Sequence, residues 1–177
     1  MTVTTFELPR QNCRTLLGRP LPRSLDKITG VIVHSTGGSA ESAVNWFKNR
    51  RSHVSAHATI RTDGVILKAL FGGRCLETVM YHAGISRGWE GKGCNLYTVG
   101  VEYEHVDRDR SGVWPSEQID AAVEWILAIK KVCPNLRYIA RHRDVAPGRK
   151  VDPDSQYPID EVAARTGLIW WRPQMTR

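Results

Sequence analysis

Short apolar runs alternate with longer amphipathic segments along this chain. The run GVIVH at residues 30–34 lacks polar alternation, which predicts a strand buried on both faces. A second apolar strand is expected at residues 136–140. Residues 57–70 hold two β-rich runs around an Asp-Gly pair at 63–64, a pattern typical of a hairpin turn. The chain therefore contains several short strands that are candidates for one sheet.

A further strand is predicted at residues 97–105, where the letters YTVGVEYEH alternate between apolar and polar. Side chains alternate between the two faces of a sheet. Val99 and Val101 are therefore expected on one face, and Glu102 and Glu104 on the other.

Helical periodicity marks three segments, at residues 39–51, 116–132 and 159–166. The first two begin with serine and carry a glutamate in the first turn, which is typical of a capped helix start. Pro134 follows the second helix, and Gly167 follows the third. These two residues predict where the helices end.

Because strands and helices interleave, we predict an α/β fold, a single domain with a central mixed β-sheet flanked by α-helices. Residues 1–27 are expected to form an irregular lead-in, residues 28–168 the domain, and residues 169–177 a tail. Residues 71–96 are rich in glycine and form a loop long enough to carry function.

The composition is that of a globular protein, with 177 residues, of which 41% are hydrophobic and 24% charged. No apolar run is long enough to span a bilayer, so no transmembrane segment is expected. The first residues lack the basic start and apolar stretch of a signal peptide. We therefore expect a protein that is made in the cytoplasm. We also expect it to be a monomer.

The chain is basic, with a formal net charge of +7. Such a charge attracts polyanions, either nucleic acid or the anionic polymers of a bacterial envelope. The arginines and lysines are dispersed, whereas nucleic-acid-binding proteins more often gather them on one helix or beside exposed aromatics. No specific nucleic-acid partner is expected.

Four cysteines are scattered without the spacing of a zinc finger, so free thiols are expected. They are Cys13, Cys75, Cys94 and Cys133.

Candidate metal ligands follow two of the predicted strands. His142 and Asp152 lie in the run ARHRDVAPGRKVDP together with Lys150, and His34 ends the strand at 30–34. Two imidazoles and a carboxylate can fill three corners of a zinc tetrahedron and leave the fourth to water. A histidine at the end of a strand is by itself more often a surface or hydrogen-bonded residue. The combination predicts a zinc hydrolase.

Five segments, VIVHST, VSAHATIRTDG, YHAGIS, CNLYTVGVEYE and ARHRDVAPGRKVDP, occur in this order within residues 28–159. Together they resemble the type 2 N-acetylmuramoyl-L-alanine amidase family, which includes phage endolysins, cytosolic peptidoglycan-recycling amidases and peptidoglycan recognition proteins. The resemblance implies one Zn²⁺ ion held by His34, His142 and Asp152. It also implies cleavage of the amide between N-acetylmuramic acid and the L-alanine of bacterial peptidoglycan.

The resemblance also assigns the groups that assist catalysis. In some members a tyrosine precedes the histidine of the second segment, but here that position is Ala56. In the recycling amidases a strand glutamate serves as general base, and Glu102 occupies that position here. Glu104 is the competing candidate, with a salt-bridged structural role as its alternative. Lys150 would stabilise the oxyanion that develops during attack on the amide.

Five further residues are candidates for substrate contact, each with an alternative as a packed or structural residue. They are Thr36, His57, Tyr81, His82 and Asn95.

Other polar and aromatic side chains receive structural expectations. Asp144 is a candidate to hold an imidazole ligand by its second nitrogen. His53 and His105 are expected on the surface. Trp170 and Trp171 either form an exposed patch or, as is more common, cap the core.

Within the family, the basic charge, the missing signal and the absence of a separate wall-binding segment favour a phage or prophage endolysin. Such an enzyme would reach the wall after the membrane is permeabilised. A cytosolic recycling amidase acting on soluble muropeptides is the first alternative. A non-catalytic peptidoglycan-binding module is the second, although Lys150 and Asp152 disfavour it.

Overall fold

The structure is a computed structural model that describes residues 2–16, 19–20, 22–84, 86, 93–105 and 113–172. Within these residues it contains a seven-stranded sheet, a small two-stranded sheet and four α-helices. The strands are β1 (Val3–Glu7), β2 (Thr15–Leu16), β3 (Arg19–Pro20), β4 (Gly30–Ser35), β5 (Ala58–Ile60), β6 (Ile66–Leu70), β7 (Thr98–Tyr103), β8 (Tyr138–Arg141) and β9 (Ile169–Trp170). The helices are α1 (Ala40–Lys48), α2 (Ser116–Val132), α3 (His142–Val145) and α4 (Ile159–Thr166), with short 3-10 turns η1 (Arg10–Asn12), η2 (Leu25–Lys27) and η3 (Cys94–Leu96).

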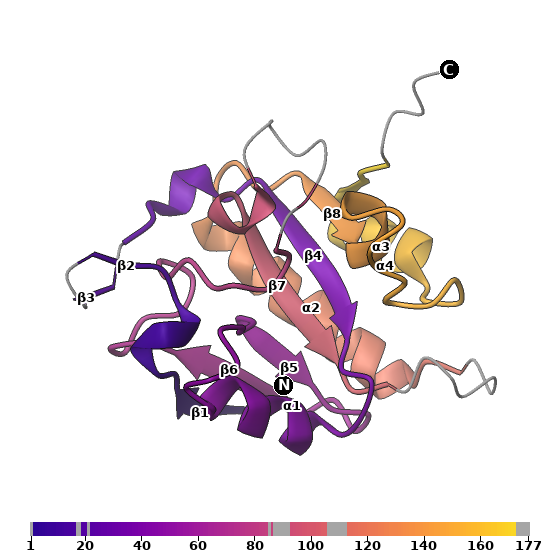
Figure 1. The fold of residues 1–177 in the computed structure, drawn as a ribbon. Coiled ribbons are helices and arrows are strands. Elements are labelled where there is room, and N and C mark those ends of the chain that lie inside the picture. Colours follow the sequence, from indigo (N-terminus) through magenta and orange to yellow (C-terminus); the bar gives the residue numbers. More distant parts are fainter. Residues whose placement is uncertain are drawn as a thin grey trace.

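The large sheet has the strand order β1-β6-β5-β7-β4-β8-β9. Only β5 and β6 pair antiparallel, as the predicted hairpin; the other neighbouring strands pair parallel. Figure 1 shows β4 and β7 side by side at the centre, with helices on both faces of the sheet. The predicted α/β fold with a mixed sheet is therefore confirmed.

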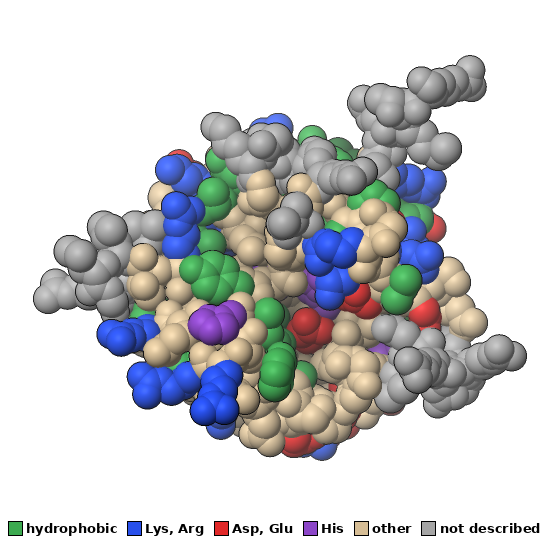
Figure 2. All heavy atoms as spheres, viewed as in Figure 1, with side chains coloured by type: hydrophobic (Ala, Val, Ile, Leu, Met, Phe, Trp, Pro, Cys, Tyr) green, Lys and Arg blue, Asp and Glu red, His purple; other side chains and the backbone are tan. Residues whose placement is uncertain are grey.

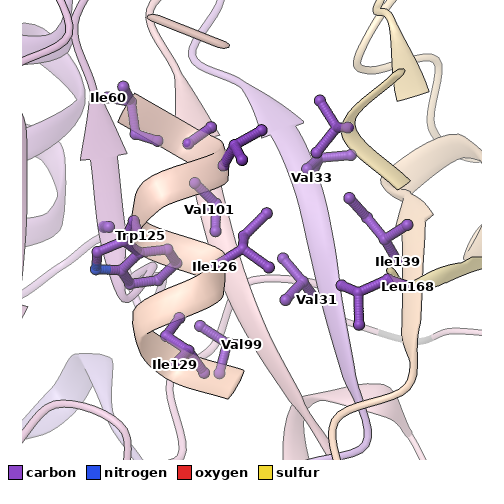
Figure 3. Close-up of a cluster of buried hydrophobic side chains, with 14 of the residues drawn as sticks. Val31, Val33, Ile60, Val99, Val101, Trp125, Ile126, Ile129, Ile139 and Leu168 are labelled. Carbon is purple, nitrogen blue, oxygen red and sulfur yellow. The ribbon is translucent and has the colours of Figure 1, made fainter. Parts of the chain in front are cut away.

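The main core lies between the sheet and helix α2. Val99 and Val101 of β7 face this helix, as their alternation predicts, and pack against Ile126 together with Val31 of β4. Figure 3 shows these side chains from the strands and from helix α2 lying between the helix and the sheet. Burying each such side chain contributes about 1.5–3 kcal/mol. Because the odd-numbered residues of β7 point into this core, the even-numbered ones point to the opposite face.

Helix boundaries follow the chemistry of the residues at their ends. The Ser39 hydroxyl accepts a hydrogen bond from the backbone N–H of Ser42 at 3.1 Å, which confirms the expected cap of α1. Gly167 ends α4 in the left-handed conformation, as predicted. Helix α2 runs over the predicted residues, but its N-cap is Pro115, so the expected serine cap is wrong there.

The N-terminal lead-in is more ordered than predicted. Strand β1 pairs in parallel with β6, with Val3 opposite Ile66, and extends the sheet at one edge. Most of its side chains are exposed and only Phe6 is half-buried. An exposed edge strand needs no apolar run, and for that reason the hydrophobic pattern gave no signal.

The four cysteines Cys13, Cys75, Cys94 and Cys133 are all buried free thiols, as expected. No helix among the described residues is both long and apolar enough to cross a membrane.

Candidate metal centre and substrate cleft

The ends of two neighbouring parallel strands bring the two candidate imidazole ligands together. Val33 of β4 pairs with Arg141 of β8, so the next residue of each segment, His34 and His142, lies just beyond that pair. Sites in parallel sheets form beyond the carboxyl ends of the strands for this reason. Asp152 lies in the loop that follows α3. The backbone N–H of Arg143 donates to its carbonyl at 2.9 Å, which holds that loop against the start of α3.

The three ligand atoms converge on one point. The Nδ1 atoms of His34 and His142 are 2.9 Å apart. Asp152 Oδ2 lies 3.0 Å from His142 Nδ1 and 3.4 Å from His34 Nδ1. A tetrahedral zinc site with bonds of about 2.0–2.1 Å has ligand–ligand edges of about 3.3 Å. Among the described residues, these three form the one such group with converging ligand atoms, and the donor set fits zinc.

The charge states of the ligands also suit a cation. Burial, together with the neighbouring His142 ring, lowers the pKa of His34 to about 4. Burial would raise the pKa of Asp152, but the adjoining His142 and His34 rings outweigh it and hold that pKa well below its usual value. At neutral pH His34 is therefore a neutral donor and Asp152 an ionised one, the forms that bind metal.

A cavity of about 540 Å³ opens above the three ligands. Glu102, Lys150 and Tyr81 line it together with the ligand side chains. Figure 2 shows this face of the molecule with a hollow near its centre, where acidic and histidine side chains lie deep beside a basic one. The metal centre is thus accessible to a ligand from solvent.

The two strand glutamates occupy different surroundings. Glu102 of β7 pairs with His34 of β4 in the parallel ladder and lines the cavity. The Glu104 carboxylate accepts hydrogen bonds from the backbone N–H of Ala40 and of Thr62, both at 3.0 Å, and is not among the cavity-lining residues. Glu104 therefore anchors α1 and the hairpin, through backbone groups instead of the expected salt bridge.

The sequence profile of the N-acetylmuramoyl-L-alanine amidase family matches residues 24–155. This match covers about three quarters of the chain and includes all three candidate ligands. The chain belongs to this family.

Two curated amidases resemble the chain over part of its length. N-acetylmuramoyl-L-alanine amidase A of Achromobacter lyticus is 29% identical over 109 residues, which cover 61% of this chain and 52% of that protein. The 1,6-anhydro-N-acetylmuramyl-L-alanine amidase AmpD of Escherichia coli is 31% identical over 105 residues, covering 56% and 51%. The chain thus spans about half the length of these relatives.

A solved structure of an amidase shares the fold. It is the complex of AmiD from E. coli with anhydro-N-acetylmuramic acid-L-Ala-D-gamma-Glu-L-Lys, with a TM-score of 0.66 and 22% sequence identity. The similarity covers 89% of this chain and 62% of that one.

Of the residues predicted to contact substrate, the amidase fold places three at the cavity. Thr36, Tyr81 and His82 line it. The Thr36 hydroxyl is tied to the backbone of Gly38 and of His105, so it stiffens the cavity wall.

His82 is in contact with a metal ligand. Its Nδ1 atom lies 3.2 Å from Nε2 of His34, and its Nε2 atom lies 3.2 Å from the hydroxyl of Thr98. Both ring nitrogens therefore face protein groups. Burial, with the charge of His34 nearby, lowers the pKa of His82 well below its usual value.

His57 lies outside the cavity, contrary to the expectation of substrate contact. The ring is fully buried. Its Nδ1 atom accepts the backbone N–H of Gly100 at 3.0 Å, and Nε2 lies 3.1 Å from the carbonyl oxygen of Thr78. Burial, with the Arg23 guanidinium nearby, lowers the pKa of His57 well below its usual value. The packed, hydrogen-bonded alternative for this histidine describes what the structure shows.

Asn95 also lies outside the cavity-lining residues. Its side-chain oxygen accepts the backbone N–H of Ala83 at 2.9 Å. This contact holds the segment that carries His82. No sequence pattern predicts a contact of this kind.

Asp144 does not contact an imidazole, contrary to expectation. Its carboxylate binds the Arg141 guanidinium at 2.9 Å and accepts the indole N–H of Trp170 at 2.9 Å. Arg141 also lies 4.7 Å from the centre of the Trp170 ring. Trp170 belongs to β9 and packs, partly buried, on the main core. Trp171 packs, partly buried, on a second cluster of buried side chains. The commoner alternative, in which the two tryptophans cap the core, is therefore the one observed.

The two histidines expected on the surface behave differently. His53 is exposed, as predicted. The His105 side chain is only 8% exposed, lies 3.0 Å from Asp154 and stacks on Trp114, so the surface expectation is wrong for it.

Two residues near the site were not singled out from the sequence. Trp46 lies within the helix predicted at residues 39–51; it is 53% exposed and lines the cavity. Val44 and Phe47 are buried while Trp46 is not, and its position off that helical stripe was the available signal. Arg23 looked like one of several dispersed cations; it is buried and donates to the carbonyl of Thr98 at 2.8 Å, beneath the site.

Proposed function

We propose that this protein is a zinc-dependent N-acetylmuramoyl-L-alanine amidase that hydrolyses the amide between N-acetylmuramic acid and L-alanine in bacterial peptidoglycan. The observation that carries the proposal is the convergence of His34, His142 and Asp152 at the base of an open cavity, with Glu102 on the adjoining strand. This arrangement supplies a metal-ligand set and a carboxylate base within one cleft.

His34, His142 and Asp152 would hold the Zn²⁺ ion. When bound, zinc supplies Lewis acidity toward a carbonyl oxygen and acidifies a coordinated water to a pKa of about 7. The protein's own task is to place the substrate and to move protons.

Glu102 is the proposed general base and acid. An amide leaving group departs as a free amine only when it receives a proton. The Glu102 carboxylate would take a proton from the attacking water and deliver it to the nitrogen of L-alanine as the C–N bond breaks. Its position beside His34 in the β4–β7 ladder supports this assignment, because both side chains leave the sheet on the same face.

Lys150 is the proposed stabiliser of the oxyanion. It lines the cavity together with Asp152, which lies two residues further along the chain. Its backbone N–H donates to the carbonyl of Ala146 at 3.0 Å, which fixes the turn that presents it. A preorganised donor of this kind is typically worth about 3–4 kcal/mol in the transition state.

The names of the relatives support a muropeptide substrate. AmpD of E. coli is named for 1,6-anhydro-N-acetylmuramyl-L-alanine, and the AmiD structure contains an anhydromuramyl tripeptide. Tyr81 and Thr36, which line the cavity, are the proposed substrate contacts.

For the biological role we propose a phage or prophage endolysin, present in the host cytoplasm and reaching the wall after membrane permeabilisation. The net charge of +7 supports it, since an anionic wall attracts a basic enzyme directly. A monomer without a specific nucleic-acid partner remains the expectation. The similarity to AmpD favours the second candidate, a recycling amidase that acts on soluble muropeptides.

Digestion of two substrates tests both levels of the proposal. Insoluble sacculi and soluble anhydromuropeptides are each incubated with the wild-type protein, with and without a chelator, and with Glu102→Gln as the inactive control. Mass spectrometry then reads the new ends. Free L-alanine amino termini from sacculi, formed only with metal present, are expected for an endolysin.

The other outcomes decide against parts of the proposal. Cleavage of soluble muropeptides alone would reject the endolysin and favour recycling. Retained binding to sacculi without cleavage of either substrate would reject the amidase and leave a peptidoglycan-binding module.

A further inference from the structure

The second ring nitrogens of both imidazole ligands meet one short segment, residues 82–83. Nε2 of His34 lies 3.2 Å from Nδ1 of His82, and Nε2 of His142 lies 3.2 Å from the carbonyl oxygen of Ala83. We propose that His82 and the Ala83 carbonyl are positioning groups that fix the tautomer and ring orientation of the two metal-binding histidines. His82 is then a metal-site residue and not a substrate contact. This inference rests on the proposed zinc site.

A chain of hydrogen bonds sets the direction of the contact between His34 and His82. The Thr98 hydroxyl lies 2.7 Å from the carbonyl oxygen of Cys94, which can only accept, so the hydroxyl proton is committed there. The Thr98 oxygen must therefore accept at 3.2 Å from an N–H at Nε2 of His82.

A neutral imidazole carries a single N–H. With that proton on Nε2, Nδ1 of His82 is an acceptor and receives the N–H at Nε2 of His34. Nδ1 of His34 is then left with a lone pair, and this is the atom that faces His142 and Asp152. The chain thus prepares His34 as a metal ligand through Thr98 and Cys94, without any contribution from the metal itself.

The same result is reached for His142 by a shorter route. The Ala83 carbonyl oxygen can only accept, so Nε2 of His142 carries the proton and Nδ1 carries the lone pair. Arg149 also donates to this carbonyl, at 2.6 Å. This second donor helps to hold the carbonyl in place.

The segment itself is held at two further points. The side-chain oxygen of Asn95 accepts the backbone N–H of Ala83 at 2.9 Å. The His82 ring packs directly on Gly100 of β7, where a β-carbon would come within 2.3 Å of the ring. These contacts fix the position of the His82 ring, as a group that orients a metal ligand requires. Such groups commonly contribute about 10–100-fold to metal affinity.

Paired variants at position 82 test the proposal. His82→Asn keeps an acceptor where Nδ1 stood, because the Asn side-chain oxygen branches from the same carbon. His82→Phe keeps a ring but has no acceptor. The zinc dissociation constant is measured by competition with a chromophoric chelator, and the visible spectrum of the Co²⁺-loaded protein reports ligand geometry. We expect His82→Phe to weaken zinc binding by about 10–100-fold and to alter the Co²⁺ spectrum. His82→Asn should retain most of the affinity.

Thr98 supplies a second pair that leaves all ligands and His82 in place. Thr98→Val removes the hydroxyl that fixes the His82 tautomer, and Thr98→Ser restores it. We expect weaker zinc binding for the valine variant and near wild-type binding for serine. His53→Asn, at an exposed histidine, controls for loss of an imidazole anywhere in the chain.

The outcomes separate this inference from the proposed function. Failure of the wild-type protein to bind zinc would reject the zinc site itself. Tight zinc binding by wild type that is unchanged in both His82→Phe and Thr98→Val would overturn the positioning role alone. If His82→Phe does not fold, the Thr98 pair decides.

Discussion

Two histidine–aspartate pairs lie close together in the sequence of this protein, yet only one belongs to the candidate metal centre. His142 and Asp152 approach to 3.0 Å, and His105 and Asp154 also approach to 3.0 Å. The two aspartates are separated by a single residue. The contact distance therefore cannot distinguish a ligand pair from a structural one.

What distinguishes the pairs is the third partner. The first pair meets a second imidazole, His34, and opens to the cavity. In the second pair, the ring of His105 stacks on Trp114 with 4.0 Å between ring centres, and neither member of that pair lines the cavity. Convergence of three donors beside accessible space is the property to look for, rather than a histidine–carboxylate contact alone.

Replacing one histidine of each pair by alanine should give the largest difference in zinc binding. His142→Ala is expected to abolish stoichiometric zinc binding and to reduce activity to background, since two ligands hold the ion poorly. His105→Ala is the matched control and should retain one zinc per chain. Zinc content after gel filtration measures both, and a zinc-free His105→Ala that is still folded would contradict the distinction.

The two strand glutamates extend the contrast from ligands to catalysis. Glu102→Gln should keep zinc and lower kcat by about 10²–10⁴-fold, the usual contribution of a general acid–base group. Glu104→Gln should instead lower stability, because its carboxylate bonds two backbone N–H groups, while kcat stays near wild type. Single-turnover rates on a soluble muropeptide provide the readout. Equal rate losses in both variants would remove the assignment of Glu102.

Replacing Lys150 by methionine removes a cation from the cavity wall and keeps most of the side-chain volume. We expect kcat to fall by about 10²–10³-fold with little change in zinc affinity. Steady-state kinetics with parallel zinc titration would check this. A change confined to KM would assign Lys150 to substrate binding instead.

Acid should lower the stability of the metal-free protein, because His34 is buried in its neutral form. The folded-state pKa of His34 is about 4, below the unfolded value of about 6.5, so the unfolded chain binds protons first as the pH falls. Stability should therefore decrease from pH 6.5 to pH 4, by about 3 kcal/mol from this residue. Urea unfolding at pH 7 and pH 4.5 tests it. His34→Asn should show a shallower pH dependence.

The smallest effect is expected at the structural pair. His105→Asn keeps a hydrogen-bonding side chain but loses the stack on Trp114. The cost should be about 1 kcal/mol of unfolding free energy, with zinc affinity unchanged. Thermal unfolding with and without zinc would measure it, and a shift that appears only with zinc bound would place His105 in the metal centre.

The fold was predictable where local chemistry set the boundaries. The ends of helices α2 and α4 were predicted closely, since Pro134 and Gly167 follow them and the apolar periodicity is regular. Strand β1 was missed because its pairing with β6 joins residues more than 60 positions apart, and its side chains are mostly exposed. Long-range pairing of an edge strand leaves no local trace.

The proposed metal ligands could be identified from the sequence because the two imidazoles lie at or just after the end of a recognisable apolar strand. The surrounding contacts could not be identified in this way. His82 and Asn95 were candidates for substrate contact, yet in the folded chain His82 contacts His34 and Asn95 accepts the backbone N–H of Ala83. For His57 the sequence left substrate contact and a packed role equally open; the ring is fully buried, with Arg23 Nη2 at 3.1 Å from its Nε2, a contact between residues 34 positions apart.

Gly100 carries no chemistry and contacts no ligand of the metal, yet it limits what the chain can tolerate. A β-carbon there would come within 2.3 Å of the His82 ring, and the backbone of the same residue bonds His57 on the neighbouring strand. In a library that samples every substitution, position 100 should be as intolerant as a metal ligand. A lack of substitutions at position 100 among functional variants would then mark a place where the fold cannot accommodate a β-carbon.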